Sequence, residues 1–295
     1  MFRLIHISDV HLGPLPSVKF HQFFSKRITG YINWKLKRKS SLGNDYLDTI
    51  ITDIKSKEVD HIALTGDLIN LALPDEYKLA NKFLKELGAP ENIIANCGNH
   101  DAYVTGAMQK SINNWAPYLS GDNQQITTTA DYPTLRKRED IALISCNSAE
   151  ATLPFFATGY CSRDQAKRLE KILQETKDMY RVVMIHHPPL EDATPWAKRL
   201  IGYERFQEVI TKYGAELILH GHTHQATINK IAGPNNEVPV VCVPATGKAP
   251  SGRGPAGRYN LFSIEKNKSG WSTTMEEFGF TESSDGVELI SSRKL

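Results

Sequence analysis

The sequence lacks any long hydrophobic run. Among its 295 residues, of which 40% are apolar, no stretch approaches the roughly 18 consecutive apolar residues that a membrane-spanning helix requires. The start also lacks the pattern of a secretory signal, because Met1 and Phe2 lead directly into an apolar, strand-like segment. These features argue against an integral membrane protein and lead us to expect a cytoplasmic one.

Cysteine is scarce, and its spacing suggests no pairing. The four cysteines, Cys97, Cys146, Cys161 and Cys242, form no C-x-x-C motif. A zinc knuckle, a disulfide framework and a reactive thiol are the functional alternatives. A chain of this length can bury a core without disulfides, so we interpret the four as small apolar residues at core edges.

Short apolar runs alternate with helical patterns along most of the chain. The runs are rich in Val, Ile and Leu, as buried strands are. They cover residues 3–7, 61–65, 92–96, 141–146, 181–185, 216–219, 238–243 and 260–264. This alternation of strand and helix predicts an α/β layered fold.

The helical segments have apolar residues on one face and recognisable ends. Positions 47, 50, 51 and 54 share a helix face, as do 206, 209, 210 and 213. A third helix is predicted by the spacing of Leu79, Phe83 and Leu87, with Gly88 as the C-terminal cap of that helix. Ser162 followed by Gln165 is typical of a capping box that opens a fourth helix.

Polar side chains collect where the apolar runs end. Seven of the ten histidines occur at such positions, together with three aspartates and one asparagine. The residues are Asp9, His11, Asp67, Asn99, His100, Asp101, His186, His187, His220, His222 and His224. Because ligands of open α/β sheets bind beyond the carboxyl ends of the strands, we expect these side chains to share one rim.

This set of side chains suits metal ions. Carboxylate, imidazole and amide groups are ligands for Zn, Mn, Fe or Mg, and no thiolate is among them. Asp9 with His11, and His222 with His224, are spaced so that extended backbone aims both members to one side. Two divalent ions would leave net positive charge for an anionic substrate. The pattern therefore predicts phosphate ester hydrolysis by two metals roughly 3.5–4 Å apart.

Five motifs follow one another in a recognisable order. They are Asp9-Val10-His11, Gly66-Asp67, Gly98-Asn99-His100-Asp101, the His186 block and Gly221-His222-Thr223-His224. Any one alone is weak, but together they resemble the blocks of the calcineurin-like metallophosphoesterases. The resemblance spans residues 9–224 and implies a four-layer α/β/β/α sandwich of two mixed sheets. We expect one such domain over residues 1–280.

The resemblance also implies roles for the site residues. Asp9, His11 and His224 would hold one divalent cation, Asn99, His186 and His222 the other, and Asp67 would bridge both. His100 would protonate the leaving group or steady the phosphate, and Asp101 would orient His100. A hydroxide bridging the two metals would attack phosphorus in line. The ligand types leave the metal open among Mn, Fe, Zn and Mg.

The residues after Asp67 distinguish between branches of this family. The sequence continues Leu68-Ile69-Asn70, without the Asp-Arg-Gly extension of the protein serine/threonine phosphatases. Asn70 stands where purple acid phosphatases have a tyrosine ligand. The blocks are closest to the bacterial class III cyclic-nucleotide phosphodiesterase type. We therefore expect a phosphodiesterase acting on a cyclic nucleotide or a similar small phosphodiester.

Three alternatives stay open at this point. One is a UDP-diacylglucosamine-type pyrophosphatase of lipid A synthesis, although His100 stands where the commonest such enzymes have arginine. DNA exonucleases share the blocks but usually add a capping domain, so we expect no nucleic-acid duplex as partner. The third is a metal-poor protein-interaction scaffold, which the seven filled ligand positions disfavour.

The near-neutral charge conceals a basic insertion after the first motif. Lys and Arg number 35 against 33 Asp and Glu, yet no acidic residue occurs between His11 and Asn44. The insertion, about residues 15–44, interleaves seven basic residues with aromatic and aliphatic ones. Residues 19–39 could contact an anionic membrane or an acidic ligand, form a lid that selects substrate, or pack as an ordinary amphipathic helix.

Three further places carry weaker signals. The glycine-rich loop 245–260 contains Lys248, Arg253 and Arg258, which could cradle a phosphate, although a surface turn is the simpler interpretation. His187 could contact substrate beside His186. The last residues, 281–295, form a polar C-terminal tail.

Overall fold

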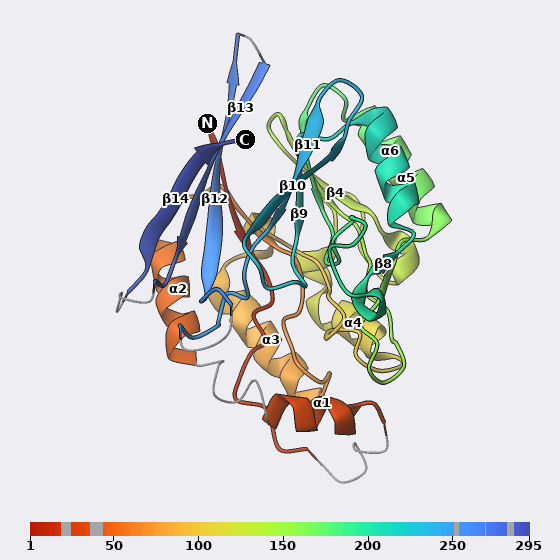
Figure 1. The fold of residues 1–295 in the computed structure, drawn as a ribbon, viewed down its shortest axis with the longest axis vertical. Helices are drawn as coiled ribbons and strands as arrows, with labels where there is room; N and C mark the ends of the chain where they lie inside the picture. The colour runs from red at the N-terminus through yellow and green to blue at the C-terminus, as the bar shows by residue number, and fades with distance from the viewer. Residues whose placement is uncertain (19–24, 36–43, 251–253, 269, 282–285) are drawn as a thin grey trace.

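A computed structural model of the chain describes residues 1–18, 25–35, 44–250, 254–268, 270–281 and 286–295. Two six-stranded mixed sheets form its centre (Figure 1). The first sheet has the order β14 (Glu288–Lys294), β13 (Gly270–Gly279), β12 (Arg258–Asn267), β1 (Phe2–Ile7), β2 (His61–Leu64), β3 (Ile93–Ala95). The second has the order β10 (Thr227–Ala232), β11 (Glu237–Cys242), β9 (Leu217–His220), β7 (Tyr180–Met184), β5 (Ile141–Ser145), β4 (Thr134–Arg138). A small parallel pair joins β6 (Gly159–Tyr160) to β8 (Leu200–Ile201).

Six α-helices are described, and all but the first cover the outer face of a sheet. The helices are α1 (Arg27–Asn33), α2 (Asn44–Ser56), α3 (Pro74–Leu87), α4 (Ala107–Leu119), α5 (Arg163–Glu175) and α6 (Tyr203–Tyr213). One core cluster joins the first sheet to α2, α3 and α4, and a second joins the other sheet to α5 and α6. A third cluster lies between the sheets. These layers confirm the predicted α/β/β/α sandwich (Figure 1).

Strand β1 illustrates how the sequence builds these layers. Leu4 packs between the two sheets, whereas Ile5 and Ile7 pack against the helices. Successive side chains of a strand point to opposite faces, and both faces are buried here. Four of the six residues of the strand are therefore apolar, in line with the apolar run expected at residues 3–7.

The helical predictions are confirmed except in two details. The predicted face of α2 is buried, and α6 ends at Gly214. In α3, however, Leu79 is exposed, because the buried face runs through Ala80 and Leu84 instead. Ser162 caps α5 by accepting a hydrogen bond from the Gln165 N–H, but the Gln165 side chain hydrogen-bonds the Asn147 backbone, so no reciprocal box forms.

Most of the missed strands lie towards the sheet edges. β13 and β14 contain few apolar residues, and β10 is largely exposed, so none of the three forms an apolar run. Residues 288–294 of the predicted polar tail therefore form the edge strand β14, paired antiparallel with β13. The four cysteines are free and buried, as their interpretation as core residues required. No helix in the described part of the chain is long and apolar enough to span a membrane.

One buried histidine makes the stability of the fold sensitive to acid. His61 opens β2, and neither of its ring nitrogens has a hydrogen-bond partner among the described residues. Burial, aided by the nearby Arg136 and Arg138, lowers the pKa of His61 from 6.5 to about 3. Between pH 6.5 and pH 3 His61 is protonated in the unfolded chain but neutral in the folded chain. The free energy of unfolding therefore decreases as the pH falls from about 6.5 towards 3.

We therefore expect His61→Leu to flatten the acid side of the stability profile. Lowering the pH from 7 to 5 should decrease the free energy of unfolding by about 2 kcal/mol less in the variant than in the parent protein. Urea unfolding of the metal-free protein and variant at both pH values measures this. An identical loss in the two proteins would contradict the assignment.

Candidate metal centre

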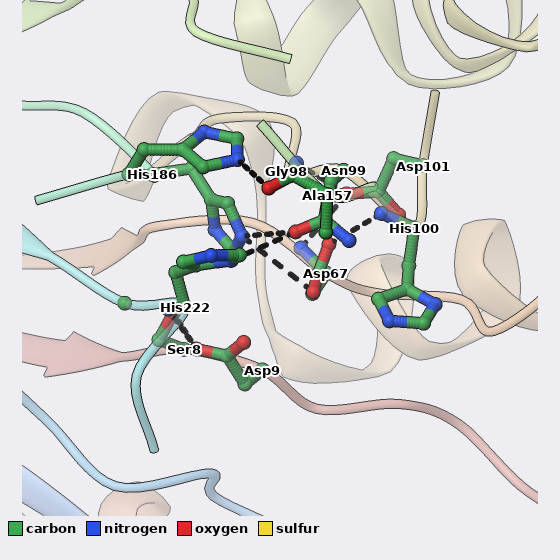
Figure 2. Close-up of polar contacts among 12 residues, drawn as sticks. Ser8, Asp9, Asp67, Gly98, Asn99, His100, Asp101, Ala157, His186 and His222 are labelled. Carbon is green, nitrogen blue, oxygen red and sulfur yellow. Dashed lines mark hydrogen bonds and ion pairs between the residues drawn. The ribbon is translucent and has the colours of Figure 1, made fainter. Parts of the chain in front are cut away.

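The predicted site residues meet where strands of both sheets end. Parallel strands β1, β2 and β3 of the first sheet lead to the loops that carry Asp9, Asp67 and Asn99. Parallel strands β7 and β9 of the second sheet lead to His186 and His222. Carboxyl ends of parallel strands share an edge, so five segments distant in sequence converge on one place. Figure 2 shows Asp67 and Asn99 between His100 on one side and the two histidines on the other.

Asp9, His11 and His224 form a first group of potential ligands. The Asp9 Oδ1 atom lies 3.0 Å from His224 Nε2 and 3.9 Å from His11 Nε2. The Nε2 atoms of the two histidines are 3.4 Å apart. One carboxylate oxygen and two ring nitrogens thus converge on one point.

Asn99, His186 and His222 form a second group. The amide oxygen of Asn99 lies 2.8 Å from Nδ1 of His222 and 3.3 Å from Nε2 of His186. His222 therefore presents Nδ1, while its Nε2 lies 3.0 Å from the Lys198 carbonyl oxygen. This group offers one oxygen and two nitrogen atoms.

Asp67 lies between the two groups. Its Oδ2 atom is 3.7 Å from His11 Nε2 in the first group and 3.5 Å from His186 Nε2 in the second. Its Oδ1 atom accepts a hydrogen bond of 2.8 Å from the His100 backbone N–H. A single carboxylate is thus within reach of both groups.

Hydrogen bonds behind the site fix the orientation of its side chains. The Nδ1 atom of His186 lies 2.7 Å from the Thr65 carbonyl oxygen, so it must carry hydrogen and leaves Nε2 free to face Asp67. The second oxygen of Asp9 accepts hydrogen bonds from Ser8 Oγ at 2.7 Å and from the His222 N–H at 2.9 Å. Oriented rings and carboxylates of this kind are typical of metal ligands.

The backbone of the site is strained. Nine residues other than glycine have positive φ in the described part of the chain, and five of them are predicted ligands. Those five are Asp9, His11, Asp67, His222 and His224. Left-handed backbone is uncommon for such residues and tends to occur where function requires it. The concentration at this rim therefore supports a functional site.

Neighbouring glycines let the loops pack closely. A Cβ atom on Gly221 would overlap Ser8 Oγ and the Asp9 carboxylate, and one on Gly98 would overlap the Asp67 carboxylate. Gly66, with φ of 102°, would place a Cβ only 2.6 Å from the Gly98 nitrogen. The glycines of the motifs thus allow the close backbone approach on which this packing depends.

The electrostatics suit bound cations. Burial alone would raise the pKa of the Asp9 carboxyl, but the adjacent His224, His186 and His11 hold it well below its usual range. Burial, reinforced by His186, lowers the pKa of His222 far below 6.5 and keeps that ring neutral. Ionised carboxylate and neutral imidazole are the forms that bind metal.

His100 stands beside Asp67 at the edge of the two groups. Its ring lies edge-on to His11, with 4.8 Å between ring centroids, and stacks on Tyr103 at 5.4 Å. Its Nδ1 atom lies 2.6 Å from the Asn70 carbonyl oxygen and so carries hydrogen. The other ring nitrogen, Nε2, is the atom that can exchange a proton with a ligand.

Asp101 is fully buried behind the turn that carries Asp67. Its carboxylate accepts hydrogen bonds from the backbone N–H groups of Asp67, Leu68, Ile69 and Gly98. Burial and repulsion by Asp67 raise the pKa of Asp101 to about 8, against the effect of the hydrogen bonds from Gly98 and Ile69. These contacts fix the loops on which Asp67 and Asn99 stand.

Two residues of the basic insertion, Lys26 and Arg27, contact the loops around this site. The sequence did not predict these contacts. Lys26 Nζ donates hydrogen bonds to Thr152 Oγ1 and the Phe156 carbonyl, and lies 4.8 Å from the Tyr103 ring centroid. Arg27 donates to the carbonyls of residues 71 and 72, next to the carbonyl that holds His100. Neither contact leaves a periodic or motif signal, so only the folded chain reveals it.

The remaining predicted residues have different surroundings. His187 is buried beside the second group: its ligand atom lies within 4.8 Å of those of His186 and His222, and its ring centroid is 4.4 Å from that of His222. Its ring nitrogens lie near Ser148 Oγ and the Ala157 carbonyl. Arg258 forms an ion pair of 2.6 Å with Glu277 of β13. Lys248 is partly buried. Arg253 lies outside the described residues, as do residues 19–24 and 36–39 of the basic segment. Their contacts with substrate stay predictions.

The donor set fits two divalent cations. Potential ligand atoms of Asp9, His11 and His224 lie within 4.8 Å of one another, as do those of Asp9, Asp67 and His186. The atoms are carboxylate and amide oxygens and imidazole nitrogens, without a thiolate, which suits hard or borderline metals. The shared position of Asp67 matches a pair of neighbouring ions.

Comparisons with known proteins agree with this geometry. The calcineurin-like phosphoesterase family model matches residues 2–226. A probable cyclic nucleotide phosphodiesterase of Vesicomyosocius okutanii subsp. Calyptogena okutanii (strain HA) is 25% identical over 83% of this chain and 86% of its own length. The glycerophosphodiester phosphodiesterase GpdQ of Enterobacter lignolyticus (strain SCF1) is 25% identical over 82% of this chain and 77% of its own.

Solved structures show the same fold at low identity. A dimetal phosphatase from Danio rerio superposes with a TM-score of 0.64 at 11% identity, covering 98% of each chain. A purple acid phosphatase from yellow lupin superposes with a TM-score of 0.60 at 13% identity, covering 99% of this chain and 53% of its own. The family model spans most of the sequence and contains all five motif blocks. The chain therefore belongs to the calcineurin-like phosphoesterase family and is a metallophosphoesterase.

Proposed function

We propose that the chain is a phosphodiesterase that uses two divalent cations to hydrolyse a small phosphodiester, with a cyclic nucleotide as the first candidate. The observation that carries the proposal is the pair of ligand groups that share Asp67, with His100 at their edge. The phosphodiesterases named among the relatives, at about 25% identity, favour a diester over a monoester.

Seven side chains would hold the two cations. The first ion belongs to Asp9, His11 and His224, the second to Asn99, His186 and His222, and Asp67 is common to both. When bound, such ions polarise the phosphoryl oxygens, offset their charge and supply an activated water as nucleophile. The donor atoms admit Mn, Fe, Zn or Mg.

His100 supplies the proton that the leaving oxygen needs. With Nδ1 donating to the Asn70 carbonyl, the ring can release a proton only from Nε2. The stacked Tyr103 holds the ring plane. Asp101 acts as a positioning residue, because its four backbone hydrogen bonds fix the turn that carries Asp67.

A substrate screen tests the proposal. The purified protein, supplemented with each metal in turn, is given a cyclic nucleotide, an aryl phosphodiester, an aryl phosphomonoester and a UDP-sugar pyrophosphate. We expect hydrolysis of the diesters, abolished by a chelator and restored by metal. Cleavage of the monoester alone would overturn the choice of phosphodiesters, and cleavage of the pyrophosphate alone would establish the pyrophosphatase alternative.

A further inference from the structure

Large apolar side chains are exposed in one region beside the metal centre. In the described part of the chain eleven large apolar residues are exposed, and seven of them lie in residues 26–35, 152–160 and 195–201. We call these three segments the apolar rim. Its most exposed members are Phe155 at 84%, Leu153 at 74% and Trp196 at 66%.

The three segments of the apolar rim contact one another. Lys26 Nζ donates hydrogen bonds to Thr152 Oγ1 at 2.6 Å and the Phe156 carbonyl at 2.7 Å, which joins the start of α1 to the second segment. The rings of Phe156 and Trp196 meet edge to face at 5.7 Å, which joins the second segment to the third. The three segments of the rim are therefore contiguous.

The same segments form the wall of the metal centre. The Lys198 carbonyl oxygen lies 3.0 Å from His222 Nε2, and the Ala157 carbonyl oxygen lies 3.2 Å from His187 Nε2. Lys26 reaches the ring of Tyr103, which stacks on His100. Whatever binds the apolar rim therefore lies next to the reacting groups.

The fold does not explain the residues at the tip of the rim. Phe155 has φ of 71°, a left-handed conformation that is costly for a bulky side chain, and its ring is almost entirely in water. Strained and exposed aromatic residues contribute little to a core and are found at binding surfaces. Leu153, two residues earlier, is similarly exposed.

The charge of the rim indicates what binds there. Its three segments contain five basic residues and not one acidic residue; the five are Lys26, Arg27, Lys35, Lys198 and Arg199. Lys35 and Lys198 are exposed, and Arg199 stacks on Trp196 at 4.4 Å. The acidic residues that flank these segments, among them Glu150, Glu191, Asp192 and Glu204, lie outside the rim in sequence. Exposed aromatic and aliphatic tips among cations match the interface of an anionic lipid bilayer.

We propose that the apolar rim docks this enzyme on an anionic lipid bilayer. Phe155, Leu153 and Trp196 insert between head groups, and the exposed Lys35 and Lys198 pair with lipid phosphates. Docking brings the metal centre to the membrane surface. The inference does not depend on the identity of the substrate, because binding to vesicles is measured without turnover.

Co-sedimentation with vesicles tests this inference. The full chain is mixed with vesicles of phosphatidylcholine alone or of phosphatidylcholine with phosphatidylglycerol. We expect binding to the anionic vesicles, weakened by salt, and a roughly tenfold or greater loss of affinity in the double variant Leu153→Ser, Phe155→Asn. Asparagine is chosen because it tolerates left-handed backbone. Leu289→Ser, an exposed apolar residue of β14 outside the rim, is the matched control and should bind like the parent.

Three outcomes would contradict membrane docking by the apolar rim. Failure of the parent chain to bind anionic vesicles would overturn it, as would equal binding by the parent and the double variant. A parent chain that dimerises in solution, with a monomeric double variant and no vesicle binding, would assign the rim to a second copy instead. Circular dichroism and an unchanged urea unfolding midpoint confirm that the double variant remains folded.

Discussion

Replacing Asp67 with asparagine is expected to reduce diester hydrolysis about a thousandfold and to lower the bound metal below two ions per chain. The Asp67 Oδ2 atom is 3.7 Å from His11 Nε2 and 3.5 Å from His186 Nε2, so this carboxylate is within reach of both groups. Asparagine keeps the shape of the side chain but removes the negative charge that two cations share. Metal analysis and turnover of the same preparation measure the two effects.

The choice of asparagine separates loss of metal from loss of fold. Asp67 has φ of 56°, and asparagine tolerates this left-handed backbone better than alanine does. Asp48→Asn, on the exposed side of α2, is the matched control and should retain full metal and activity. A variant at Asp67 that retains two ions and full turnover would show that this carboxylate does not join the two ions.

His100→Ala is expected to retain both metals and lose about 10²- to 10⁴-fold in turnover, the usual contribution of a general acid. The His100 ring stands beside Asp67 and is absent from both groups of ligands. The loss should depend on the leaving group. Diesters of an acidic phenol, which departs without a proton, should lose much less than diesters of an aliphatic alcohol.

The leaving-group dependence distinguishes the proton donor from a residue that only supports the site. An equal loss with both kinds of diester would indicate that His100 positions the phosphate instead. Loss of metal from the variant would place His100 among the ligands and contradict its role as the proton donor. Unchanged turnover would remove it from the reaction altogether.

Much of the fold could be predicted because buried strands have a simple signature. Strands such as β1 and β7 are apolar on both faces, and their polar neighbours Asp9 and His186 mark where they end. Edge strands lack that signature. β14 has the sequence ELISSRK, with no apolar run, so its place in the sheet depends on pairing with β13 rather than on its own composition.

The metal site could be predicted from spacing, but the parts that hold it in place could not. The motif blocks supply the ligand types, whereas the left-handed backbone at His11 and His224 arises only when the loops pack together. The bonds of Lys26 to residues 152 and 156 join segments more than a hundred residues apart. Contacts of this range follow from the tertiary fold and leave no local pattern.

The most direct test of the two-metal centre is a crystal structure of the manganese-loaded protein with anomalous diffraction. Two bound ions should give two anomalous peaks, about 3.5–4 Å apart, with the Asp67 carboxylate contacting both. One peak should lie among Asp9, His11 and His224, the other among Asn99, His186 and His222. A single peak, or two peaks that do not share Asp67, would contradict the two-metal centre.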